Sequence, residues 1–178
     1  MTQERSNVIT FKNNPMTLCG EDLTVGQTIP QACVIANDLS EVCLADNTNR
    51  RARIIVTVPS LDTPVCDIEA QRFNNEAAKL QNVDVQIISM DLPFAQKRWC
   101  GANSASNIQT LSDYRGAQAS LALGVLIKEL HLAARAVFVV DADNRITYRE
   151  IVSEVTNEPN YAAALEAAQI ASGALARA

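Results

Sequence analysis

One short segment combines a cysteine with a local pattern that can make a thiol reactive. Cys66 follows the apolar run 54–58 and precedes a segment with helical spacing, so we expect it where a strand passes into the first turn of a helix. Backbone N–H groups point outward at such a turn and the helix dipole is positive there, which favours a thiolate over a thiol. The hydroxyls of Ser60 and Thr63 are close by in the sequence. A buried, unreactive cysteine after a core strand fits the same pattern, so these residues alone leave both interpretations open.

The other reactive residue types limit how Cys66 could be activated. The chain has five cysteines, and the absence of any C-x-x-C pair argues against both a zinc site and a thioredoxin-type dithiol. His131 is the only histidine, so a site with several histidine ligands is excluded and a Cys–His pair has one possible base. We therefore expect no metal and no cofactor, and an arginine or backbone dipoles as the activating groups. Cys33 and Cys43 lie in short apolar runs, which favours unreactive core thiols over a structural disulfide.

The composition is that of a folded protein. With 178 residues, 48% of them hydrophobic, the chain can bury a core as one domain over residues 1–178, with residues 1–7 as a flexible tail. A net charge of −5 argues against a nucleic-acid partner, because phosphate binding needs a basic face. No apolar run approaches the ~18 residues of a membrane span, and the polar N-terminus has no signal-peptide pattern. We expect a soluble cytoplasmic protein with no membrane partner, or a periplasmic one if an export signal has been removed.

The order of the expected elements indicates an α/β fold. β-Branched residues predict a buried strand over 53–58, and apolar spacing predicts an amphipathic helix of about four turns after it. In that helix we expect Thr63 to cap the start and Glu69 to point away from the apolar face. A strand over 83–90 completes a parallel βαβ unit. The other expected elements are a hairpin over 8–18, strands at 32–36, 42–44, 108–111, 136–140 and 145–152, and helices over 95–100 and 160–174; the segment 121–126 fits either a helix or a loop.

This order is that of a thioredoxin-like fold. A parallel βαβ half is joined to an antiparallel hairpin and a last helix, giving a mixed central β-sheet flanked by helices, with an N-terminal β-hairpin in front. In such a sheet, reactive groups lie at the carboxyl ends of the central strands, where Cys66 is expected.

Several blocks of the sequence resemble one family. Pro59, Thr63 and Cys66 match the peroxiredoxin active-site pattern P-x-x-x-T-x-x-C. With four more blocks in the same order, the chain resembles the bacterial thiol peroxidase subfamily of peroxiredoxins over about residues 8–170: Asp91–Gln96, Arg98–Gly101, Ala134–Val137 and Glu158–Tyr161. Pro64 differs from the glycine of many members, but proline is sterically acceptable at the first helical position.

The resemblance implies an enzyme that reduces hydrogen peroxide and organic hydroperoxides. It implies that Cys66 is the peroxidatic cysteine and Cys100 the resolving cysteine of the same subunit, joined during turnover by an intramolecular disulfide. Thr63 and Arg135 correspond to the hydroxyl and guanidinium that surround the peroxide, and Pro59 to the residue that shields the sulfur from water. The implied reductant is thioredoxin, the implied assembly is a homodimer, and no cofactor is implied.

The implied disulfide requires the chain to move. The two Cα atoms must come within about 7 Å, and helix starts are not normally that close. We therefore expect one or both helical segments to unwind after oxidation, the short helix that carries Cys100 more easily.

Two other functions fit the same fold. One is a thiol–disulfide oxidoreductase or electron carrier, which the missing C-x-x-C pair disfavours. The other is a non-catalytic binding or chaperone-like protein in which Cys66 is structural. Consumption of peroxide that depends on Cys66 distinguishes both from a peroxidase.

Overall fold

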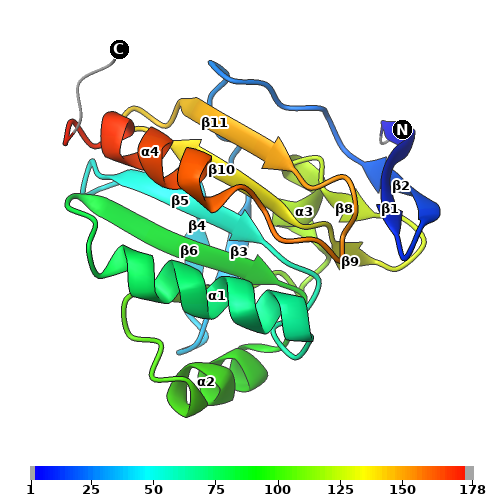
Figure 1. Cartoon of the computed structure of the whole chain (residues 1–178), viewed down its shortest axis with the longest axis horizontal. Helices are drawn as coiled ribbons and strands as arrows, with labels where there is room; N and C mark the ends of the chain where they lie inside the picture. The colour runs from blue at the N-terminus through cyan, green and yellow to red at the C-terminus, as the bar shows by residue number, and fades with distance from the viewer. Residues whose placement is uncertain (1–2, 175–178) are drawn as a thin grey trace.

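The computed structural model describes residues 3–174, whose strands form two sheets (Figure 1). The strands are β1 Glu4–Phe11, β2 Asn14–Cys19, β3 Cys33–Ala36, β4 Glu41–Cys43, β5 Ala52–Thr57, β6 Val83–Ser89, β7 Gln109–Ser112, β8 Leu126–Ile127, β9 Leu132–Ala133, β10 Ala136–Val140 and β11 Ile146–Ile151. The helices are α1 Pro64–Ala77, α2 Pro93–Ala102, α3 Gln118–Ala122 and α4 Tyr161–Ala171.

The central sheet is mixed and has seven strands in the order β11-β10-β5-β6-β7-β3-β4. β5, β6 and β7 run parallel, whereas β10 is antiparallel to both β5 and β11. A smaller sheet of four strands, β1-β2-β8-β9, contains the N-terminal hairpin. The expected βαβ unit, C-terminal hairpin and thioredoxin-like architecture are confirmed.

Strand β5 is buried on both faces, which explains its continuous apolar sequence. Successive side chains point to opposite faces of a strand. Ile54 and Val56 accordingly lie in one core cluster with Phe73 of α1, and Ile55 lies in the other cluster. Figure 1 shows α1 and α4 on the same face of this sheet. Packing on both faces of the sheet holds the carboxyl end of β5 in a fixed position. It also fixes the start of α1, which follows β5 in the chain.

The structure differs from the expected elements in several places. Residues 4–7, expected in a flexible tail, belong to β1, and residues 4–6 pair with β2, while residues 1–2 lie outside the described part. The segment 121–126 contains the end of α3 and the start of β8, and neither β8 nor β9 was expected. These strands of two residues each are too short to show a periodic pattern. Within the described residues, we find no helix with the length and apolar character needed to cross a membrane.

Candidate active site

Cys66 lies in the first turn of α1 and is completely buried. The helix begins at Pro64, whose ring fits the first helical position because no N–H is needed there. Thr63 occupies the expected N-cap position, but its side chain does not cap the helix. The Thr63 hydroxyl instead donates to the carbonyl oxygen of Ser60, at 3.0 Å. This bond joins two residues of the turn that precedes the helix and so restrains that turn.

Arg135 is the cation next to the Cys66 sulfur. It immediately precedes β10, which pairs with β5 so that Ala136 faces Thr57 near the active-site turn. The Arg135 side chain is only 2% exposed, and its Nη2 donates to Cys66 Sγ at 3.3 Å. Its Nε donates to the carbonyl oxygen of Val155 at 2.9 Å, which fixes the plane of the guanidinium. The resemblance implied that Arg135 surrounds the peroxide, and in the structure its guanidinium contacts the Cys66 sulfur.

Glu69 is a member of this cluster that the sequence did not reveal. Expected to point away from the core, it is fully buried and accepts a hydrogen bond from Arg135 Nη1. Its spacing of one helical turn from Cys66 was the available signal, because such residues share a helix face. Burial raises the pKa of Glu69 to about 7 against the opposing effect of Arg135. Burial would lower the pKa of Arg135, but the nearby Glu69 and Cys66 outweigh it and raise that pKa.

A cavity of about 300 Å³ opens beside the guanidinium. Pro59, Thr63 and Arg135 line it together, so the structure brings three of the expected site residues to one place. Apolar side chains make up much of the remaining wall: Phe11, Pro64, Val65, Leu130, Leu132 and Val155. Cys66 does not line the cavity itself, but its buried sulfur contacts Arg135, which does.

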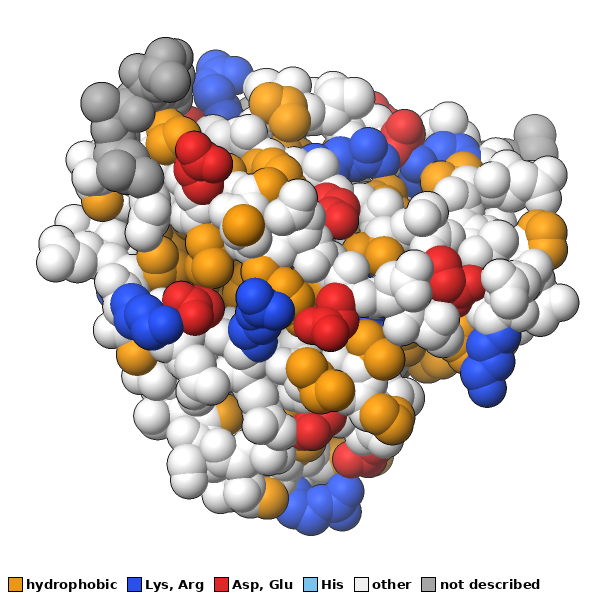
Figure 2. Space-filling view, in the orientation of Figure 1, with side chains coloured by type: hydrophobic (Ala, Val, Ile, Leu, Met, Phe, Trp, Pro, Cys, Tyr) orange, Lys and Arg blue, Asp and Glu red, His pale blue; other side chains and the backbone are white. Residues whose placement is uncertain are grey.

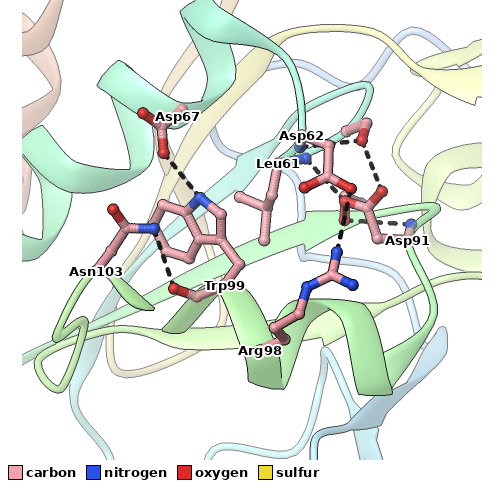
Figure 3. Close-up of polar contacts among 9 residues, drawn as sticks. Leu61, Asp62, Asp67, Asp91, Arg98, Trp99 and Asn103 are labelled. Carbon is pink, nitrogen blue, oxygen red and sulfur yellow. Dashed lines mark hydrogen bonds and ion pairs between the residues drawn. The ribbon is translucent and has the colours of Figure 1, made fainter. Parts of the chain in front are cut away.

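Cys100 lies on a separate helix and is not bonded to Cys66. Both are free thiols, and Cys100 is half-buried on α2 with its sulfur 3.3 Å from the Thr110 hydroxyl. One of the contacts that hold this helix against α1 is the hydrogen bond that Trp99 Nε1 donates to Asp67 Oδ1, at 2.8 Å (Figure 3). Cys100, which the resemblance implies as the resolving thiol, therefore does not line the cavity that Pro59, Thr63 and Arg135 share.

Cys33 and Cys43 form a disulfide, so the expectation of two unreactive core thiols is wrong. The two residues face each other on β3 and β4, and both are half-buried. With Glu41 they form the one group of three potential metal ligands found among residues 3–174. Their sulfurs are bonded to each other in this structure and are not available as ligands.

Comparison with known proteins relates the whole fold to one family. The Redoxin family model matches residues 24–165. The chain is 52% identical to the thiol peroxidase of Halalkalibacterium halodurans over 163 residues, which cover 92% of this chain and 98% of that protein. It is also 52% identical to the thiol peroxidase of Bacillus subtilis, over 90% of this chain and 96% of that protein. The chain belongs to the thiol peroxidase family. The expected family and enzyme class, a peroxiredoxin-type peroxidase, are confirmed.

Solved structures agree with the thiol peroxidase fold. A peroxiredoxin-like protein from Aquifex aeolicus matches with a TM-score of 0.86 and 40% identity, covering 92% of this chain and 96% of that chain. The thiol peroxidase from Chromobacterium violaceum matches with a TM-score of 0.78 over 87% of this chain and 91% of that chain. Its 20% identity supports the fold only.

Proposed function

We propose that this thiol peroxidase reduces hydroperoxides at Cys66, with Cys100 as the resolving thiol of the same chain. The observation that carries the proposal is the hydrogen bond of 3.3 Å from Arg135 Nη2 to the Cys66 sulfur. A guanidinium keeps its positive charge at physiological pH. It therefore stabilises the negative sulfur, which is the form of a cysteine that attacks a peroxide.

In the first step the Cys66 thiolate attacks one oxygen of the hydroperoxide and the O–O bond breaks. The sulfur is oxidised to a sulfenic acid, and the other oxygen leaves as an alcohol or as water after taking up a proton. Arg135 stabilises the charge that moves onto the leaving oxygen. The Thr63 hydroxyl on the same cavity wall can hydrogen bond to the peroxide, and the ring of Pro59 keeps water from the sulfur.

In the second step the Cys100 sulfur attacks the Cys66 sulfenic acid, a disulfide forms and water leaves. Cys100 first has to leave its contact with Thr110. Its helix also has to give up the hydrogen bond between Trp99 and Asp67. The resulting loop would make the disulfide worth about 3–4 kcal/mol in the chain-entropy model, which offsets part of the local unfolding.

The cavity supports organic hydroperoxides as substrates besides hydrogen peroxide. Its volume of about 300 Å³ exceeds the space that hydrogen peroxide alone needs, and much of its wall is apolar. An alkyl chain placed there would lose contact with water, which contributes favourably to binding.

The reductant and the assembly follow from the family resemblance. An intramolecular disulfide is reopened by a dithiol through two exchange reactions, and we propose thioredoxin as that dithiol. We propose a homodimer and a cytoplasmic location on the same basis. Figure 2 shows acidic and basic side chains interspersed on one face of the molecule, an arrangement that does not favour a nucleic-acid partner.

Peroxide consumption by single-cysteine variants tests this assignment. Wild type should turn over peroxide with thioredoxin, Cys66→Ser should not, and Cys100→Ser should complete one turnover without an intramolecular disulfide. Cys19→Ser is the matched control, because Cys19 is a buried free thiol on β2. Unchanged peroxide consumption by Cys66→Ser would refute the proposal. Reduction of insulin disulfides without peroxide turnover would favour a thiol–disulfide oxidoreductase instead.

A further inference from the structure

A second pair of cysteines forms a disulfide at one edge of the central sheet. Strands β6 and β7 separate this edge from β5, which leads into the active-site turn. Cys33 and Cys43 face each other on β3 and β4, with Cα atoms 3.9 Å apart. β4 is the edge strand of the seven-stranded sheet, and both residues are half-buried, so solvent reaches this bond. Cys66, by contrast, is completely buried.

We infer that Cys33–Cys43 is a second, reversible redox centre whose state controls how readily Cys100 leaves its resting place. The inference rests on the proposed role of Cys100. It has two parts, the reversibility of the bond and the influence of its redox state on Cys100.

The disulfide can open and close reversibly because the hairpin that carries it does not depend on it. The two cysteines are only 10 residues apart in sequence, and short loops gain least from a cross-link. β3 and β4 are also paired at Val34 with Val42 and at Ile35 with Glu41. The hairpin therefore persists when the disulfide opens, and the sulfurs stay close enough to bond again.

Closing the pair is an oxidation by two electrons. Glu41 Oε1 lies 4.0 Å from Cys43 Sγ, and the carboxylate and both sulfurs lie within 4.8 Å of one another, so its charge disfavours a thiolate at both cysteines and either can attack first. When Cys33 is first, its sulfur attacks a hydroperoxide oxygen, the O–O bond breaks, and an alcohol or water leaves with the proton. Cys43 then attacks the sulfenic sulfur, the S–S bond forms, and the hydroxyl leaves as water with the second thiol proton. A dithiol reverses the reaction by two exchanges and becomes a disulfide itself.

A continuous series of contacts connects this pair to Cys100. The turn between β3 and β4 carries Asn37, whose Nδ2 donates to the Thr110 hydroxyl at 2.9 Å. The same hydroxyl lies 3.3 Å from Cys100 Sγ. Asn37, Thr110 and Cys100 also line one cavity of about 370 Å³, together with Asp38 of the turn. The turn of the disulfide hairpin is thus part of the surroundings that Cys100 leaves.

The direction of the effect follows from these contacts. A closed disulfide restrains the hairpin and keeps Asn37 on Thr110, which holds Cys100 in place. When the pair is open, only the pairing of β3 with β4 holds the hairpin, so the turn fluctuates more, the hydrogen bond of Asn37 weakens and Cys100 leaves more often. A neutral hydrogen bond of this kind corresponds to about a fivefold change in an equilibrium. Oxidation of the second pair should therefore slow formation of the Cys66–Cys100 disulfide by up to about fivefold.

Reversibility can be tested without peroxidase activity. In the Cys66→Ser/Cys100→Ser variant, alkylation and mass spectrometry would count the free thiols of the second pair. Peroxide should close the pair and a dithiol should reopen it while the protein stays folded, as followed by circular dichroism. A pair that stays closed in the dithiol, or stays open in peroxide, would overturn the inference whatever the role of Cys66.

The influence of the second pair on Cys100 is tested by rapid-quench experiments on enzyme that keeps both Cys66 and Cys100. The Cys33→Ser/Cys43→Ser variant should form the Cys66–Cys100 disulfide up to about fivefold faster than wild type with its second pair closed, and Asn37→Ala should act in the same direction. Cys19→Ser should match wild type. Equal rates in all four proteins would overturn the inference but leave the peroxidase intact. Absence of any Cys66–Cys100 disulfide in wild type would instead refute the proposed function.

Discussion

The hydrogen bond between Trp99 and Asp67 should set the rate at which Cys100 reaches Cys66. Trp99 is 7% exposed, and its Nε1 donates to Asp67 Oδ1 at 2.8 Å, which joins α2 to α1 (Figure 3). A hydrogen bond to a charged acceptor contributes about 1.5–3 kcal/mol. Trp99→Phe keeps an aromatic ring but removes the donor. Because each 1.4 kcal/mol corresponds to about a factor of ten, the variant should populate the unwound α2 at least tenfold more.

The assay is a rapid-quench experiment with peroxide equal in amount to enzyme. Free thiols are alkylated at timed intervals, and the products are measured by mass spectrometry. This gives the rates at which the Cys66 sulfenic acid disappears and the disulfide appears. Trp99→Phe should form the disulfide about tenfold faster. It should also accumulate less sulfinic acid at high peroxide, because the sulfenic acid is removed sooner.

A matched control separates this bond from a general weakening of α2. Arg98 on the same helix lies 3.7 Å from Asp62, with side-chain exposures of 73% and 63% (Figure 3). Exposed ion pairs contribute at most about 1 kcal/mol, so Arg98→Gln should change the rate less than Trp99→Phe. Disulfide formation in Trp99→Phe at or below the wild-type rate, with the variant still folded, would refute the reasoning.

Two further predictions concern the dependence of stability on pH. Because the pKa of Glu69 is raised from 4.5 to about 7 by burial, its contribution to stability should fall as the pH rises through that interval. Glu69→Gln should remove this slope from urea unfolding, and an unchanged slope would contradict the assignment. Burial opposes the shift at Glu154, but hydrogen bonds from Asn13, Thr10 and Thr156 outweigh it and lower its pKa from 4.5 to about 2. That contribution should be present above pH 4.5 and lost as the pH falls towards 2. Glu154→Gln should flatten the acid side of the stability curve, and an acid side as steep as that of wild type would count against this role.

Local sequence patterns were sufficient to predict a helix or strand where burial and the direction of the chain permit only one structure. The β-branched residues of β5 and the apolar spacing of α1 predicted a strand followed by a helix, and the structure has both. The same patterns located Cys66 at the junction, since its position follows from two neighbouring elements. Strands of two residues, such as β8 and β9, carry no such pattern and were missed.

The contacts around Cys66 depend on elements far apart in the chain. Arg135 reaches the sulfur because β10 pairs with β5, and no spacing within the sequence encodes that register. Family resemblance supplied Arg135. Glu69 was missed although it lies one helical turn from Cys66, because a glutamate on a helix is usually solvated. Only tertiary packing buries Glu69 and places Arg135 beside it.

The cysteines show most clearly what the sequence determines and what only the tertiary structure determines. The sequence by itself determined that Cys66 follows a strand and starts a helix, since that geometry is local. It could not determine which cysteines pair, because pairing depends on the distance between Cα atoms on different elements. Only the antiparallel register of β3 and β4 brings Cys33 opposite Cys43, while α2 holds Cys100 against Thr110.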